Sequence, residues 1–453
     1  MKGYAKYVEV ESRWAKYIPE SWTFSNIAEV FIERKENNNP IKTMDILSLT
    51  NTRGVIPYKE KGNIGNKAKE DLTGYRLAYP GDIVFNSMNA VIGSVGLSKY
   101  FGAVSPVYYM LYLRDTAKNN IRFFDYVFQD RVFQSGLNGL GNGILEIRMR
   151  IPMSKLKYVG VPVPPRTEQD QIVRYLDWQV SKINRLIAVK RKEIALLREQ
   201  IQQTITDVVY HGVDQTVNYQ PVKMLYVDKI PEHWKCKRGK FLFAEHDIRS
   251  TDGKEELLSV SHITGVTPRS QKNITMFKAE SLVNYKICRK NDIAANTMWM
   301  WQGAIAVSSY HGVISPSYNT YHQIDNAYDS AYLDYMLRSK PLVDEYYVRS
   351  TGIRKSRLRL YPEQLLDMFF PVPPVEEQKR IAAVIAEKTQ AANDFIAAIE
   401  KQIEKINEFR VRMISDVVTG QIDVRGIEVP VFEMVRVTVE EQEEDAEEIM
   451  QET

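Results

Sequence analysis

Two long stretches of the chain place apolar residues at alternating steps of four and three. Such steps put side chains on one face of a helix and are typical of a coiled coil. The first stretch contains Leu176, Val180, Ile183, Ile187, Ile194, Leu197, Ile201 and Val208, with Lys190 and Thr204 in its two gaps. The second stretch contains, in the same register, Ile385, Thr389, Ala392, Ile396, Ile399, Ile403, Ile406, Arg410, Met413 and Val417. Gly212 and Gly420 follow the stretches, where a glycine commonly ends a helix.

A single helix with such an apolar stripe cannot bury it alone in water. Because the two stripes match in length and phase, the sequence predicts that both helices pair within one chain as an antiparallel coiled coil. The alternative is a coiled coil between separate chains, which would make the protein an oligomer.

The two stretches belong to an internal repeat. Three motifs occur twice in the same order, displaced by 209 to 212 positions: Ile-Pro-Glu-x-Trp at 18–22 and 230–234, Ser-Pro-x-Tyr at 105–108 and 315–318, and Pro-Val-Pro-Pro-x-x-Glu-Gln at 162–169 and 371–378. This period is far too long for a solenoid unit, so each half is predicted to be a globular domain followed by a helix. The expected boundaries are 1–161 for the first domain, 162–212 for the first spacer helix, 213–370 for the second domain, 371–420 for the second spacer helix and 421–453 for a tail.

Both globular domains are expected to mix helices and strands. Short β-rich runs, such as 82–85 and 305–308, alternate with Gly, Asn and Pro turn signals. Helices are expected at 121–133 and 330–346. The predicted fold class is α+β, with two mixed domains separated by the paired helices and related by a pseudo-twofold repeat.

Charge is divided unevenly along the chain. The formal net charge is +3, but residues 430–453 contain nine acidic residues and one basic residue, which leaves +11 on the remainder. A basic body favours a polyanionic partner such as nucleic acid. Two cysteines, no apolar leader and no run of 18 apolar residues favour a cytoplasmic protein without a membrane span or a disulfide framework.

Common catalytic signatures are missing from the sequence. We find no phosphate-binding loop, dinucleotide fingerprint, His-Glu-x-x-His pair or nucleophile elbow. The six histidines are scattered, and the ligand-like spacing of His233 and Cys236 has no second pair to complete a zinc site. The sequence therefore predicts no catalytic residue and no metal site.

Three regions instead carry side chains suited to DNA: a polar loop, the segment after the short strand expected at Asp82-Ile83 and its counterpart at Asp292-Ile293, and paired arginines that follow a glycine. Lys and Arg can contact phosphates, while Arg, Asn, Gln and His can bond to base edges. The candidates in the first domain are Arg53, Lys59, Lys61, Asn63, Lys67, Asn89, Arg148 and Arg150, and those in the second are His262, Arg269, Lys272, Asn273, Trp299, Trp301, Arg357 and Arg359. The alternatives are ordinary solvated loops, tryptophans of the core and intramolecular salt bridges.

The repeated motifs and the matched helices together resemble the specificity subunit of type I restriction-modification systems. The resemblance covers nearly the whole chain. The family pattern favours glycine after Pro-Glu in the two openings, whereas Ser21 and His233 stand there in this chain.

The resemblance implies a non-catalytic subunit whose two target recognition domains each read half of a split, asymmetric site on double-stranded DNA. It also implies two modification subunits that methylate adenine, and through them restriction subunits. S-adenosylmethionine, ATP and Mg are then expected in the partner subunits and none in this chain. Alternative functions are a specificity subunit for a methyltransferase alone or for another type of system, and a coiled-coil scaffold protein.

Overall fold

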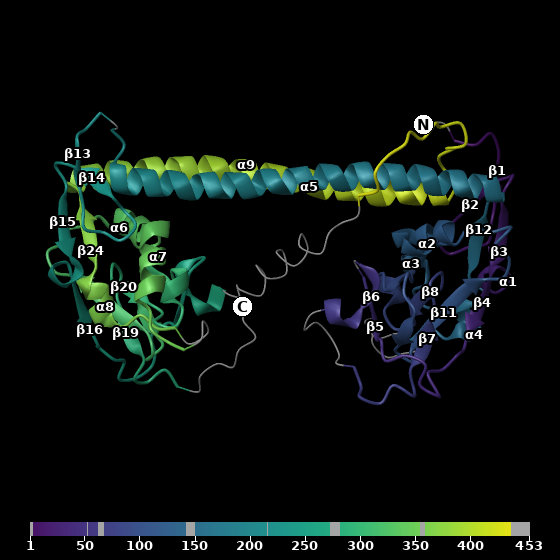
Figure 1. Cartoon of the computed structure of the whole chain (residues 1–453), viewed down its shortest axis with the longest axis horizontal. Helices are drawn as coiled ribbons and strands as arrows, with labels where there is room; N and C mark the ends of the chain where they lie inside the picture. The colour runs from purple at the N-terminus through teal and green to yellow at the C-terminus, as the bar shows by residue number, and fades with distance from the viewer. Residues whose placement is uncertain are drawn as a thin grey trace. The chain divides into compact units, whose positions relative to one another are not determined.

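The computed structural model describes residues 3–51, 53–61, 68–141, 150–214, 216–271, 281–353 and 358–435. These residues form two compact units: unit 1 contains residues 3–187 and 402–435, and unit 2 contains residues 188–401. Each unit comprises one globular domain and part of each of two long helices, α5 (Arg166–His211) and α9 (Val375–Val418) (Figure 1).

The domain of unit 1 is built on a four-stranded antiparallel sheet. The strands of the whole domain are β1 (Tyr7–Glu9), β2 (Tyr17–Pro19), β3 (Thr23–Asn26), β4 (Phe31–Arg34), β5 (Leu47–Thr50), β6 (Gly54–Pro57), β7 (Arg76–Ala78), β8 (Ile83–Asn86), β9 (Val95–Leu97), β10 (Gly102–Val104), β11 (Tyr108–Leu113) and β12 (Gly160–Val163). Its short helices are α1 (Ile27–Val30), η1 (Tyr58–Lys61), η2 (Ala90–Ile92), α2 (Ile121–Gln129), α3 (Arg131–Gly136) and α4 (Met153–Leu156). The sheet order is β4-β11-β8-β9, and buried Phe123, Phe124 and Phe128 of α2 join its core. The β5–β6 hairpin is a separate two-stranded element.

The domain of unit 2 repeats this plan. Its strands are β13 (Tyr219–Pro221), β14 (Lys229–Pro231), β15 (Lys235–Arg238), β16 (Phe243–His246), β17 (Leu258–Ser261), β18 (Gly265–Pro268), β19 (Lys286–Cys288), β20 (Ile293–Ala295), β21 (Ile305–Val307), β22 (Gly312–Ile314), β23 (Asn319–Gln323) and β24 (Phe369–Val372). Its short helices are η3 (Gly239–Phe241), η4 (Arg269–Gln271), η5 (Met300–Gln302), α6 (Ser330–Leu337), α7 (Lys340–Arg349) and α8 (Pro362–Asp367). The order β16-β23-β20-β21 matches that of unit 1 strand for strand. The mixed α+β class and the duplication expected from the sequence are confirmed.

Each helix expected at 121–133 and 330–346 is divided into two. Asp130 separates α2 from α3 with an extended backbone (φ −66°, ψ 129°), and its side chain accepts a hydrogen bond from the amide of Val132. Ser339 before α7 also has an extended backbone (φ −69°, ψ 148°), but its side chain makes no cap hydrogen bond. Pro341 lies in the first turn of α7, where its missing amide hydrogen costs nothing. The apolar periodicity continues across both breaks, which is why it suggested single helices.

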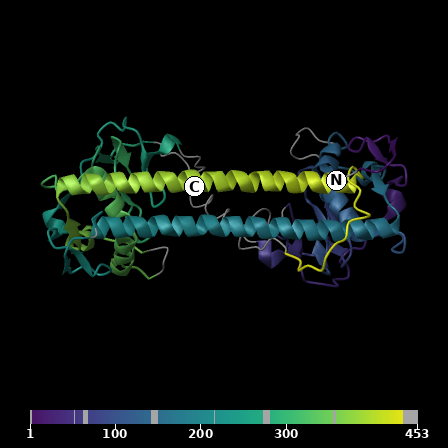
Figure 2. The same ribbon diagram turned by 90° about the horizontal axis from the view of Figure 1, so that it is seen from above.

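The long helices pair through the expected seam in both units. In unit 1, Ile183 and Ile187 of α5 join a core with Met413 and Val417 of α9, so the start of one helix packs against the end of the other. In unit 2, Val208 and Val209 of α5 pack with Ile381 and Ile385 of α9, again with opposite directions (Figure 1 and Figure 2). The seam residues that are buried in the structure are Leu176, Ile183, Ile187, Ile194, Ile385, Ile396 and Ile399, and those that are half-buried are Leu197, Ile201, Ile403 and Ile406. Gly212 and Gly420 follow the helices with φ of 76° and 73°, a backbone that favours glycine.

The repeated motifs join each domain to its helix start. In unit 1, Glu168 accepts hydrogen bonds from the Tyr4 hydroxyl and from Trp22 Nε1, the latter at 2.9 Å. In unit 2, Glu377 accepts one from Trp234 Nε1 at 3.1 Å. His233 Nε2 lies 2.8 Å from the same carboxylate, so the residue that departs from the family pattern contacts the helix start.

The glutamines of the motifs form hydrogen bonds with buried and half-buried backbone groups. Gln378 is fully buried, accepts a hydrogen bond from the Asp329 amide at 2.7 Å, and donates to the carbonyls of Ala327 at 2.9 Å and Pro373 at 2.8 Å. Gln169 makes the corresponding bonds with the Asn120 amide and the Pro164 carbonyl, both at 2.8 Å. The Glu-Gln pairs therefore have a structural role.

Replacing Gln378 by alanine is expected to destabilise unit 2. The substitution leaves one buried and two half-buried backbone groups without their partner, and a buried group left unpaired costs about 1 to 3 kcal/mol. Thermal and urea unfolding of the full chain measure the loss. Gln390→Ala, at an exposed glutamine of the same helix, is the control and should change stability by less than about 0.5 kcal/mol. Equal stability of the two variants would contradict the assigned role.

Residues 421–435, which the sequence places in the tail, form part of unit 1. Val424 is buried, and Gln171 of α5 donates hydrogen bonds to the carbonyls of Val424 and Ile427 at 3.0 and 2.6 Å. Farther along, Asn184 Nδ2 donates to the Val435 carbonyl at 3.0 Å. This segment thus follows α5 from residue 171 to residue 184. No helix of the described chain has the length and apolar character needed to cross a membrane.

Candidate nucleic-acid interface

The turn after the central strand has the same backbone in both domains. We call residues 86–94 the η2 turn and residues 296–304 the η5 turn. Asn89 has φ −123° and ψ 12°, and its counterpart Trp299 has φ −123° and ψ 10°. Gly93 and Gly303 close the turns with φ of 99° and 91°. Two equal scaffolds therefore present different side chains.

The side chain of a buried asparagine forms a hydrogen bond with the backbone of each turn. The Asn86 side chain accepts a hydrogen bond from the Met88 amide at 3.0 Å, and Asn296 accepts one from the Met298 amide at 3.3 Å. Asn296 also donates to the Tyr318 hydroxyl at 2.9 Å. These bonds fix the turn backbone, so the exposed residues that follow are held in place.

The second arginine of each predicted pair lies beside its turn. The amide of Ile151 donates to the Ser87 carbonyl at 2.8 Å, and the amide of Leu360 donates to the Thr297 carbonyl at 3.3 Å. Arg150 and Arg359 directly precede these residues, and both are exposed. The structure therefore brings together two regions that are about 60 residues apart in the sequence.

In each domain the tip of a hairpin, β5–β6 in unit 1 and β17–β18 in unit 2, forms a candidate surface together with the turn and the arginine. Gly54 of β6 packs closely on Gly96 of β9: a Cβ added to Gly96 would lie 3.1 Å from the Cα of Gly54. In unit 2, Gly265 packs on Ala306 of β21, and Arg338 Nη2 donates to the carbonyl of His262 at the hairpin tip. Because β9 and β21 follow the η2 and η5 turns, the hairpin tips lie beside these turns.

The candidate residues of the polar loops differ in their exposure and in their contacts. Arg53 donates to the Glu60 carbonyl at 2.8 Å and pairs with the Glu60 carboxylate at 3.0 Å, so its charge is already partnered. Lys59 is exposed, Lys61 lies over the Tyr58 ring, and Arg269 and His262 are half-buried. The candidates that lie outside the described residues are Asn63, Lys67, Arg148, Lys272, Asn273 and Arg357.

An aromatic cluster occupies the η5 turn. The rings of Trp299 and Trp301 stack with centroids 6.0 Å apart at 22°, and Tyr347 of α7 lies 6.2 Å from Trp301. Trp301 Nε1 donates to the Met298 carbonyl at 3.1 Å, while 46% of Trp299 is exposed. The sequence gives no signal for Tyr347, because it lies 43 positions after the end of the turn and within a helix.

Neither cysteine has the properties of a reactive nucleophile. Burial raises the pKa of the Cys236 thiol to about 11 and that of Cys288 to about 12, so both remain protonated at neutral pH. Among the described residues, no group of three His, Cys, Asp or Glu side chains is placed to hold a metal ion.

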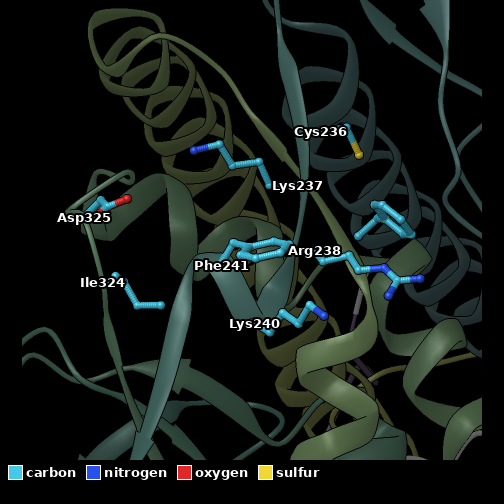
Figure 3. Close-up of a pocket in the computed structure, with 8 residues that line it drawn as sticks. Cys236, Lys237, Arg238, Lys240, Phe241, Ile324 and Asp325 are labelled. Carbon is cyan, nitrogen blue, oxygen red and sulfur yellow. The ribbon is translucent and has the colours of Figure 1, made fainter.

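An open pocket of about 710 Å³ lies at the other end of the unit 2 sheet (Figure 3). Strand β23 begins at Asn319, opposite Ala295 next to the η5 turn, and ends beside Ile324 at the pocket. Lys237, Lys240 and the exposed ring of Phe241 line it together with Asp325. The pocket is therefore separate from the surface formed by the turn, the arginine and the hairpin.

Comparisons with known proteins show which proteins the chain is similar to. Residues 19–196 match the family model of the type I restriction modification DNA specificity domain. The chain is 23% identical over 452 residues to the type I restriction enzyme MjaX specificity subunit of Methanocaldococcus jannaschii, which covers 90% of this chain and 95% of that protein. It is 25% identical over 206 residues to the MjaVIII specificity subunit of the same organism, covering 42% and 43%.

A solved chain has the same fold. It comes from a structure addressing complex assembly and conformational transition of the type I restriction-modification system, and it matches with a TM-score of 0.54 and 14% identity. The match covers 89% of this chain and 99% of that one. With the family match over residues 19–196 and a relative that spans nearly the whole length, the resemblance of the chain to the specificity subunits of type I restriction-modification systems, the non-catalytic subunits that recognise DNA, is confirmed.

Proposed function

We propose that this subunit reads a bipartite, asymmetric DNA site, with one domain on each half-site. One observation carries the proposal: each domain has the same turn, arginine and hairpin scaffold, but the side chains on it differ. Equal scaffolds favour equal docking on DNA, and different side chains favour different base sequences.

The subunit is further proposed to bind two modification subunits through exposed apolar residues of its two long helices. Leu186 in unit 1 and Phe395 in unit 2 occupy equivalent positions of the repeat and are 45% and 51% exposed. Large apolar side chains on an exposed helix face favour a protein partner. S-adenosylmethionine would then be bound by the modification subunits, and ATP and Mg by restriction subunits.

Mapping methylated adenines in DNA from cells that carry this chain with its modification subunits tests the proposal. We expect one split sequence with two unlike halves and a fixed number of unspecified base pairs between them. Methylation without sequence preference would refute it. A split site without any DNA cleavage would favour the specificity subunit of a methyltransferase alone. For the scaffold alternative, DNA affinity should be weak and nearly independent of salt.

Replacing Arg150 and Arg359 by alanine is expected to weaken DNA binding without changing the sequence read. Both side chains are exposed beside the turns, where a guanidinium suits a phosphate. Each lost phosphate contact should reduce the slope of log affinity against log salt by about 1. Titrations of the assembled complex at several salt concentrations measure the slope. Lys240→Ala, at the pocket end of unit 2, is the control and should leave the slope unchanged. A changed methylation sequence would instead show that the arginines contact bases.

A further inference from the structure

We infer that the two domains read their half-sites by different physical means at one equivalent position: Trp299 makes an apolar, stacking contact with a base, and Asn89 makes hydrogen bonds to a base edge. This inference rests on the proposed function of the two domains. It assigns a specificity-determining role to both residues.

The equivalence of the two positions comes from the backbone. Asn89 and Trp299 both precede a three-residue 3₁₀ turn, and their φ and ψ angles differ by no more than 2°. The same carbonyl at each position accepts two amide hydrogen bonds, from Ile92 and Ser94 in the η2 turn and from Gln302 and Ala304 in the η5 turn. A side chain at this position therefore leaves an equal scaffold in the same direction.

Trp299 combines an exposed surface with a ring that is stacked on a neighbouring ring, which suits an apolar contact. Trp299 is 46% exposed and its ring stacks on that of Trp301, which is itself held by its bond to the Met298 carbonyl and by contact with Tyr347. An aromatic ring that is already immobilised loses little conformational entropy on binding. Among the described residues, Trp299 Nε1 has no hydrogen-bond partner, so the aromatic cluster does not use up this donor.

DNA is the occupant that the neighbouring charge favours. Exposed Arg359 lies one residue from Leu360, whose amide bonds to Thr297 of the same turn. A cation next to an exposed aromatic ring suits a phosphate beside a base, and apolar side chains that insert next to a base are a known means of kinking and reading DNA. Base stacking on an aromatic ring has about 1 to 3 kcal/mol per base at stake, as measured by alanine substitution.

Asn89 has the opposite chemistry on the same scaffold. Its side chain makes no cap hydrogen bond, and the η2 turn has Val91 at the position that Trp301 occupies in the η5 turn. Arg131 of α3 lies nearby, with its Nη1 3.4 Å from the Ile92 carbonyl. An asparagine amide has one donor group and one acceptor, which match the major-groove edge of adenine. Hydrogen bonding there gives preference for a particular base.

The test uses the complex of this chain with its modification subunits and duplexes in which each base pair of the methylated site is varied in turn. For Trp299→Ala we expect about 5- to 150-fold weaker binding. Its loss of preference should be confined to one or two adjacent positions of the second half-site, with the first half-site unchanged. For Asn89→Ala we expect loss of preference at one position of the first half-site only. Trp299→Phe should retain most of the second preference, which separates a lost contact from a damaged turn.

A second measurement tests the stacking directly. The fluorescent base 2-aminopurine, placed at the affected position, should be quenched by the wild-type complex and not by the complex with Trp299→Ala. Phe241→Ala removes an aromatic ring that is 59% exposed at the other end of the same sheet, and it should have no effect. An unchanged second half-site preference in a folded Trp299→Ala complex would overturn the inference. Absence of sequence preference in the wild-type complex would instead overturn the proposed function.

Discussion

A chain with Leu186→Glu and Phe395→Glu is expected to lose both modification subunits and, with them, adenine methylation. Each substitution places a charge in the middle of an apolar contact, and a buried charge without a partner costs several kcal/mol. A loss of about 3 kcal/mol at each site weakens binding by roughly 100-fold or more. Native mass spectrometry of the assembled complex and a methylation assay measure the two effects.

The single variants make this expectation sharper. Because the two residues are in different units, Leu186→Glu should remove one modification subunit and Phe395→Glu the other, each leaving a complex with one subunit fewer. Gln203→Glu adds the same charge at an exposed polar position of α5 and should leave assembly intact. Full assembly of the double variant would show that the modification subunits bind elsewhere.

Exchanging residues 23–161 for the same segment of a related specificity subunit is expected to replace one half of the methylated sequence. This segment contains the η2 turn and the β5–β6 hairpin, whereas Trp22 and Glu168, which join the domain to α5, stay in place. Each mismatched base pair costs about 1 to 3 kcal/mol, so an original half-site with three mismatches should be methylated at least about 100-fold more slowly. Sequencing of methylated DNA detects the new site.

The reciprocal exchange is the control. Replacing residues 235–370 should alter the other half and keep the first, since Trp234 and Glu377 remain to join that domain to α9. If either exchange altered both halves, the two domains would not read DNA independently.

The sequence was sufficient for the fold class, the duplication and the helix seam. Ile183, Ile187 and Ile385 recur at coiled-coil steps, and such periodicity depends only on local helix geometry. The repeat added a second, independent copy of each motif. The broken helices at Asp130 and Ser339 were missed because their apolar residues continue the helical pattern across the break, while the backbone leaves it.

The binding surface could be predicted only in part. Asn89, Trp299 and Arg359 were selected by comparing the two copies. The structure places Trp299 and Arg359 at the same turn of unit 2, and Asn89 at the equivalent position of the η2 turn in unit 1. Tyr347 could not be found, because it reaches the η5 turn through tertiary packing of α7. The pairing of Arg53 with Glu60 likewise depends on the fold of a hairpin and has no sequence signature.

The hydrogen bonds between α5 and residues 421–435 determine when the first domain can be finished during synthesis. The residues of unit 2 that the structure describes lie in one continuous segment, 188–401, so these packing partners have all emerged from the ribosome once residue 401 is free. Unit 1 needs residues 402–435, which supply buried Val417 and Val424 to its core and a carbonyl at Gly420 to the Tyr7 hydroxyl. Domains of nascent chains commonly fold in order from the amino terminus. Here the domain translated first is completed last, and until then its apolar surface on α5 is exposed to chaperones and proteases.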